Sequence, residues 1–230
     1  MRKLIVLAAL STIAAVVPIA PSAAQIADGG FETQAPLEIG ANPSGYCYGG
    51  GGFGSVDCTG VNSPWEAFSG GGYQIETNAA WPGTDTPDGS YYGFIQNGGS
   101  LNQAFVAAAT GSFVIDFLAA GRNNQTTTGN LMYEVLLNGS SIFSDATVTG
   151  QPFTARTTNA FDLIMGQNYS LSFHGLQFTG DNTAYIDAVA LSAAAPVPEP
   201  ATWAMMLLGF GAVGVAMRRR RARQLANVTA

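Results

Sequence analysis

The residues best suited to ligand binding are aromatic side chains in glycine-rich segments, together with one arginine in a polar segment. A flat ring can stack on the C–H face of a pyranose, while amide, carboxylate and guanidinium groups bond the sugar hydroxyls. Arg122, within residues 121–126, is the polar candidate; its alternative is a salt bridge or a loop hydrogen bond. Aromatic residues of β domains also pack in cores, so each ring has that alternative. The aromatic candidates are Trp65, Trp81 and Tyr91, beside Tyr46, Tyr48 and Tyr92.

Catalytic groups are sparse in this sequence. His174 is the only histidine, and a solitary histidine on the polar face of a strand is usually a surface or hydrogen-bonded residue. The chain has no Gly-x-Ser-x-Gly turn, zinc-binding helix motif or phosphate-binding glycine loop. Paired carboxylates for glycoside hydrolysis remain an alternative, because their separation cannot be read from a sequence. We therefore expect a protein that is not an enzyme, without catalytic residues.

Two cysteines, Cys47 and Cys58, flank a glycine-rich segment. In an exported chain, an even pair of cysteines close in sequence is typical of a disulfide. The alternative, a redox or metal-binding pair, lacks a Cys-x-x-Cys spacing and a nearby histidine. We predict a disulfide that closes this segment.

The charge of residues 25–195 is strongly negative. This stretch has fourteen acidic residues and only two basic ones, Arg122 and Arg156, while its neighbours at both ends carry the other basic residues. An acidic surface repels nucleic acid and anionic lipid, and it suits cations or neutral sugars. Nucleic acid is therefore excluded as a partner.

The pattern of apolar residues in this stretch is that of β-strands. Residues 112–119, 132–137 and 168–174 alternate apolar and polar side chains with a period of two, and glycine, asparagine, aspartate and threonine cluster between them. No convincing amphipathic helix is present. Many short strands joined by polar turns predict an all-β, antiparallel sandwich or barrel as a single domain.

The first residues have the features of a targeting sequence and not of a folded domain. Arg2 and Lys3 precede an apolar run, and small residues around Ala24 supply a cleavage site. Residues 1–24 are predicted to be a secretory signal peptide that passes through the Sec translocon; a retained anchor is the alternative. Residues 25–195 would then be the exported domain.

The last residues have the features of a second targeting sequence. Prolines in residues 196–200 predict an extended linker, and the uncharged run 201–217 would span roughly 25 Å as a helix. That length suffices for a thin bilayer, so a transmembrane helix is expected. Residues 218–230 would stay cytoplasmic as a basic tail, because arginines are costly to move across a membrane. The basic stop consists of Arg218, Arg219, Arg220 and Arg221.

This tail resembles the PEP-CTERM sorting signal, in the Pro-Glu-Pro-x-x-Trp-Ala-Met variant common in alphaproteobacteria. The residues that carry the likeness are Pro198, Glu199, Pro200 and Trp203, followed by the apolar run and the arginines. The resemblance implies recognition by an exosortase, a membrane transpeptidase that removes the helix and tail. A plain C-terminal anchor is the alternative.

The domain itself resembles galactose-binding-like jelly rolls, which include several families of carbohydrate-binding modules. The likeness lies in the opening residues 28–33 and the final predicted strand 181–191. It implies a jelly-roll sandwich and a structural calcium ion, with Glu32 and Asp187 as ligands and Asp28 as a further oxygen donor. Asp187 would share a face with large apolar residues, where a carboxylate needs a partner or an ion. The alternative is that these acids are solvated at the sheet edge.

Together these patterns predict an exported protein of a Gram-negative bacterium, held transiently in the inner membrane and then released to the cell surface or extracellular matrix. We expect a non-catalytic carbohydrate-binding module that associates with exopolysaccharide in biofilm. A structural or adhesion protein without a glycan ligand is the alternative.

Overall fold

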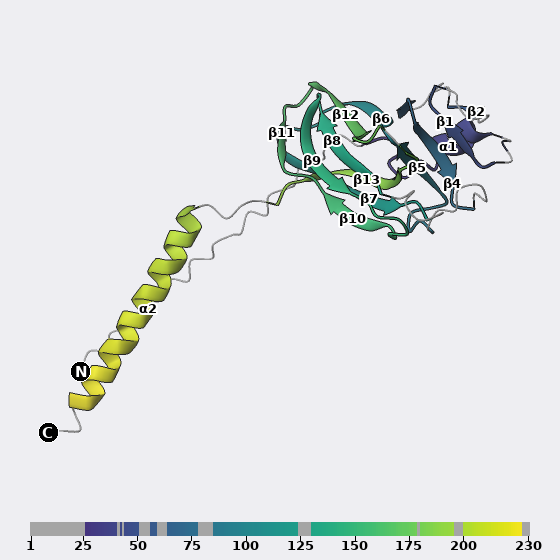
Figure 1. The fold of residues 1–230 in the computed structure, drawn as a ribbon. Coiled ribbons are helices and arrows are strands. Elements are labelled where there is room, and N and C mark those ends of the chain that lie inside the picture. The colour runs from purple at the N-terminus through teal and green to yellow at the C-terminus, as the bar shows by residue number, and fades with distance from the viewer. Residues whose placement is uncertain are drawn as a thin grey trace. The chain divides into compact units, whose positions relative to one another are not determined.

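A computed structural model describes most of the chain, which divides after Ala194 into two compact units. The first unit is a β-sandwich, and the second contains one helix (Figure 1). The predicted signal peptide, residues 1–24, lies outside the described residues. The described residues are 26–40, 42, 44–50, 56–58, 64–77, 85–123, 130–178, 180–195 and 200–226.

The larger sheet, sheet A, has eight strands, which pair antiparallel except for β1 with β2. Two of its strands, β7 and β13, are the longest of the described strands. In spatial order the sheet contains β10 (Thr154–Thr157), β7 (Gly111–Gly121), β13 (Thr183–Ala193), β5 (Tyr91–Gln96), β4 (Gly71–Ile75), β1 (Tyr46–Tyr48) and β2 (Val56–Asp57), and β11 (Phe161–Leu163) also pairs with β7.

The smaller sheet, sheet B, has five antiparallel strands. The strands predicted at 112–119, 132–137 and 168–174 are confirmed as β7 in sheet A and as β8 and β12 in sheet B. In spatial order sheet B contains β3 (Glu66–Phe68), β6 (Ser100–Val106), β12 (Asn168–Gly175), β8 (Met132–Leu137) and β9 (Ser140–Ala146).

The core lies between the two sheets and follows from the period of two. Phe113, Ile115 and Phe117 of β7 are all buried, and Leu171 and Phe173 enter the same cluster from β12. Burying one such side chain contributes about 1.5–3 kcal/mol, so this alternation accounts for much of the stability of the sandwich.

Sheet A is also covered on its other face, where a second aromatic cluster lies. Tyr92 and Tyr185 are fully buried there, with ring centroids 4.8 Å apart. Phe153 packs on Tyr92 with a centroid distance of 5.4 Å. Burial raises the pKa of both tyrosines well above the ordinary value. The cluster consists of Tyr46, Tyr48, Tyr92, Phe94, Ala120 and Tyr185, with Phe153 against it.

One short helix, α1 (Gln34–Ile39), corrects the expectation that the exported domain has no helix. Asp28 stabilises the start of this helix. Its carboxylate accepts hydrogen bonds from the backbone N–H groups of Thr33 and Gln34, at 3.0 and 2.7 Å. With six residues, α1 is too short for a helical period to stand out in the sequence.

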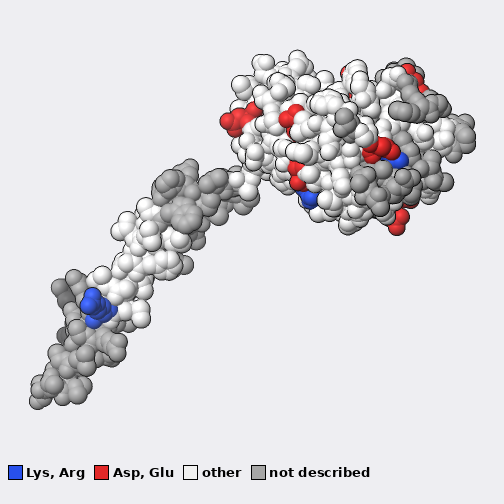
Figure 2. All heavy atoms as spheres, in the orientation of Figure 1, with Lys and Arg blue, Asp and Glu red and all other residues white. Residues whose placement is uncertain are grey.

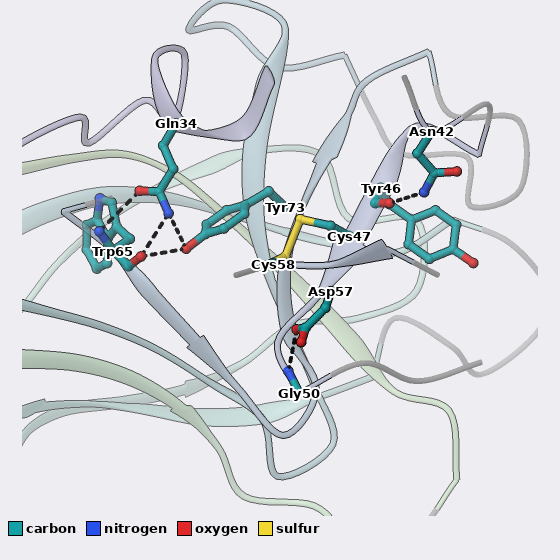
Figure 3. The surroundings of a disulfide bond; sticks show 9 residues. All are labelled: Gln34, Asn42, Tyr46, Cys47, Gly50, Asp57, Cys58, Trp65 and Tyr73. Atoms are coloured by element: carbon teal, nitrogen blue, oxygen red, sulfur yellow. Dashed lines mark hydrogen bonds between the residues drawn. A yellow bond between two sulfur atoms is a disulfide. The ribbon is translucent and has the colours of Figure 1, made fainter. Parts of the chain in front are cut away.

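The predicted disulfide is confirmed, since Cys47 and Cys58 are bonded and both are buried (Figure 3). Cys47 lies in β1, and the backbone N–H of Cys58 donates to the carbonyl of Tyr48 at 2.8 Å. The bond therefore fixes the end of β2 against β1 at the edge of sheet A.

We predict that replacing both cysteines by serine lowers the free energy of unfolding by about 3 kcal/mol, because the bond closes a glycine-rich loop that is otherwise free in the unfolded chain. Urea unfolding of the full chain, monitored by tryptophan fluorescence, measures this. Wild type treated with a reductant is the control and should match the variant. A loss below about 1 kcal/mol in both would contradict the entropic role of the bond.

The second unit contains α2 (Pro200–Ala226), a helix that is longer than the predicted run 201–217. Its apolar side chains, such as Leu207 and Phe210, are exposed. None of the described helices combines the length and apolar character that a membrane crossing requires. The helix is confirmed, and its membrane-spanning role stays a prediction.

Candidate functional site

Trp65 lies in the core and not at the surface, which corrects its assignment as a ligand contact. Its exposed fraction is 0%, and its ring lies 5.3 Å from that of Phe31 and 6.1 Å from that of Phe173. The indole Nε1–H donates to the carbonyl of Asp28 at 3.0 Å. The ring thus joins the N-terminal segment to sheet B, and the core alternative holds for this residue.

A buried glutamine, Gln34, holds the backbone around Trp65 (Figure 3). Its amide Nε2–H donates to the Trp65 carbonyl at 2.8 Å and to the Tyr73 hydroxyl at 2.7 Å. The Trp65 N–H donates back to Gln34 Oε1 at 3.1 Å, and the Tyr73 hydroxyl donates to the Trp65 carbonyl at 3.0 Å. Both ends of the amide are therefore satisfied, as burial requires.

Of the other predicted sugar contacts, the structure describes Arg122 and Tyr91. Arg122 is 4% exposed and forms a salt bridge with Asp181, with Nη1 2.8 Å from Oδ1. The same carboxylate oxygen accepts a hydrogen bond from Gln96 Nε2. Tyr91 is partly buried against the core, and Trp81 lies outside the described residues. The salt-bridge alternative thus holds for Arg122.

Asp88 and Asp187 both lie near Gly30, and Glu32 lies against Gly89; we refer to these three carboxylates as the acidic corner. A Cβ atom placed on Gly30 would lie 2.8 Å from Asp88 Oδ2 and 3.9 Å from Asp187 Oδ1. Glu32 Oε1 accepts hydrogen bonds from the N–H groups of Ser90 and Tyr91, at 2.8 and 2.7 Å. Sequence patterns pointed to Glu32 and Asp187 but not to Asp88, because segment 85–90 has no strand pattern that would place it beside β13.

Asp187 is fully buried, and burial raises the pKa of its carboxyl to about 7. Thr86 donates its hydroxyl to Oδ2, and the Ala188 N–H donates to Oδ1 at 2.7 Å; both bonds favour the ionised form. The negative charges of Asp88 and Glu32 raise the pKa further. A carboxylate on the apolar face was expected to need a partner, and Thr86 is that partner.

A β-bulge shapes the backbone at this corner. The register of β13 against β7 shifts between Asp187 and Ala190, and Ala188 has a φ of 49°. Within the shift, the Val189 N–H donates to the Gly29 carbonyl at 2.9 Å. A Cβ on Gly29 would lie 1.9 Å from the Val189 carbonyl oxygen, so only glycine permits this approach.

The calcium ion expected at Asp28, Glu32 and Asp187 stays a prediction. Both carboxylate oxygens of Asp28 accept backbone hydrogen bonds at the start of α1. In the part of the chain that the structure describes, no three His, Cys, Asp or Glu side chains form a group that could hold a metal ion.

We predict that Asp187→Asn changes the pH dependence of stability. The folded wild type binds a proton at Asp187 with a pKa of about 7 against 3.8 when unfolded, so this group's contribution is full below about pH 4 and is lost as the pH rises to about 7. The amide does not titrate, so the variant should lose this decline. Chemical unfolding in EDTA at several pH values measures it, with no divalent cation on the carboxylate.

The matched control is Asp162→Asn, which removes an exposed carboxylate from β11. This control should keep the wild-type slope of unfolding free energy against pH. Parallel curves for wild type and Asp187→Asn would show that the pKa of Asp187 is not raised in the folded state.

The residues of the sorting signal lie only partly in the described chain. Pro200 and Trp203 are part of α2, and Arg218, which is exposed, lies further along the same helix. Pro198 and Glu199 lie outside the described residues.

Comparison with solved structures finds chains that are similar to part or most of this one. A cyclase from Fischerella sp. TAU, in complex with 4-(1H-indol-3-yl)butan-2-one, has a TM-score of 0.52 at 13% identity, over 76% of this chain and 100% of that one. A family 35 carbohydrate-binding module from Clostridium thermocellum has a TM-score of 0.41 at 18% identity, over 56% of this chain and 92% of the module. At these identities the likeness to the cyclase shows the fold alone.

Sequence comparison identifies a known motif in the C-terminal residues. No curated protein sequence matches the chain at a significant level. The model of the PEP-CTERM protein-sorting motif matches residues 196–221, which include the Pro-Glu-Pro element, most of the helix and four arginines. The chain therefore carries a PEP-CTERM sorting motif, which implies an exported protein.

Proposed function

We propose that the sandwich binds a neutral polysaccharide at the cell surface or in the extracellular matrix, without cleaving it. The observation that carries this proposal is that both basic side chains of residues 25–195 form salt bridges. Arg122 pairs with Asp181, and Arg156 pairs with Asp145. Both blue patches on the sandwich in Figure 2 adjoin red atoms.

This pairing restricts the chemistry of the ligand. A polyanion, such as a nucleic acid or an acidic polysaccharide, needs cations that are free to pair with it. In residues 25–195 each cation already has a carboxylate, and the same stretch has twelve further acidic residues. A chain of uncharged hydroxyl groups meets no such repulsion, which supports a neutral glycan.

The sorting motif supports the location. The PEP-CTERM signal is recognised by exosortase, so this transpeptidase is the expected partner of residues 196–221. Export through the Sec translocon, transient anchoring in the inner membrane by α2 and release to the surface complete the proposed route. An exopolysaccharide of a biofilm is then the glycan that the protein would meet.

We predict that the full chain, purified in mild detergent, is slowed in native gels that contain at least one neutral polysaccharide from dextran, laminarin and galactomannan. Dextran sulfate should not slow it, and added salt should change the retardation little, because no ion pair forms. Dextran and dextran sulfate are a matched pair for charge. Retardation by the sulfated chain alone, or by no polysaccharide, would contradict the proposal.

We also propose a structural calcium ion at the acidic corner, where Glu32 and Asp187 would supply carboxylate oxygens beside backbone carbonyls. An ion that binds only the folded state raises the midpoint of thermal unfolding. The full chain should therefore melt higher in calcium than in EDTA, and Asp187→Asn should remove the difference while Asp162→Asn keeps it. Equal midpoints of the wild type in calcium and EDTA would exclude the site.

A further inference from the structure

The outer face of sheet B carries a row of five side chains in register across all five strands. Phe68 of β3 lies opposite Ser100 of β6, which lies opposite His174 of β12. His174 in turn lies opposite Glu134 of β8, and Glu134 lies opposite Ser144 of β9. Residues directly opposite each other point to the same side of a sheet, so these five form one line. We call it the outer row.

The burial of their neighbours shows that this line faces away from the core. Leu101, Phe173 and Val135, each next in sequence to a member of the outer row, are fully buried between the sheets. The outer row itself is accessible: the exposed fraction of Phe68 is 51%, and the side chains of His174 and Glu134 are 32% and 21% exposed.

A second line of side chains runs parallel to the outer row on the same face. It is polar except for one leucine, and it contains hydroxyl, amide and carboxylate groups. Asn102 connects the two lines, because its amide Nδ2–H donates to the Ser100 hydroxyl at 3.3 Å. The second line consists of Glu66, Asn102, Ser172, Leu136 and Ser141.

The outer faces of the two sheets therefore differ in polarity and burial. Sheet A buries Tyr92 and Tyr185 under Phe153, whereas sheet B presents serine, asparagine, histidine and glutamate. Antiparallel sheets commonly leave one face to solvent. In Figure 1 strands β8, β9 and β12 form one side of the sandwich, on which this face lies.

We propose that the outer row is the platform on which a neutral polysaccharide chain lies, crossing the strands of sheet B; this inference rests on the function proposed above. The ring of Phe68 would stack on a sugar face at one edge, and the hydroxyl, imidazole and carboxylate groups would bond sugar hydroxyls along the row. Four strand spacings give the platform a length of about 19 Å.

The charge of this face is what favours a neutral glycan over other occupants. Glu66 and Glu134 are carboxylates, and none of the described residues in the two lines is lysine or arginine. A polyanion would be repelled. A second copy of the chain in a symmetric contact would bring two further glutamates to this acidic face, and its own two lines would bring no lysine or arginine to pair with them.

The test compares Phe68→Ala and Glu134→Gln with wild type, as full chains in mild detergent, in the same polysaccharide gels. Each should raise the apparent dissociation constant about tenfold, the effect of losing one contact along the platform. Phe178→Ala is the matched control for the ring, because Phe178 is 79% exposed and lies outside both lines. Asp162→Asn is the matched control for the carboxylate, and both controls should bind as wild type does.

The outcomes separate this inference from the function on which it rests. If wild type binds no neutral polysaccharide, both fail. If wild type binds while Phe68→Ala and Glu134→Gln bind equally well, the platform is wrong and the function stands. If sedimentation shows a wild-type dimer that Phe68→Ala dissociates, the face is an interface between copies, and the platform is again wrong. Far-UV circular dichroism and thermal midpoints confirm that each variant is folded.

Discussion

The pairing of β7 with β13 is the constraint on which the rest of the sandwich depends. These strands are the longest of those described, and they place Ala193 beside Phe113 and Ala184 beside Gly121. This ladder contributes inner residues to the core and outer residues to the aromatic cluster. The bulge in the same ladder places Asp187 at the acidic corner. One long-range pairing thus positions two cores and one polar site.

Hydrogen bonds from a few polar side chains hold the loops and short elements of this fold in place. Gln34 holds Trp65 and Tyr73, Asp28 holds the start of α1, and Thr86 reaches Asp187. An unpaired group in these places would cost about 1–3 kcal/mol, so each bond selects one arrangement of the loops. The domain therefore depends on side-chain bonds where its strands are short.

Much of the fold could be predicted, because a period of two is a local signal. β7, β8 and β12 appear where the alternation placed them, and the pairing of Cys47 with Cys58 follows from their number and spacing. The ligand contacts were harder. Trp65 lies in a glycine-rich segment like a surface ring, yet it is buried, because α1 and Phe31 cover it. No local sequence pattern distinguishes an aromatic side chain that a loop exposes from one that the neighbouring segments bury.

The sequence by itself determined the sorting motif, the strand pattern, the acidic charge and the cysteine pair, since each depends on residue type and order along the chain. Only the tertiary structure decided which side chains meet. It brought Asp88 to Asp187, paired both arginines with carboxylates, and aligned Phe68 with His174 and Glu134 across sheet B. The physical reason is that strand register sets these neighbours, and register between strands tens of residues apart depends on how the whole core packs.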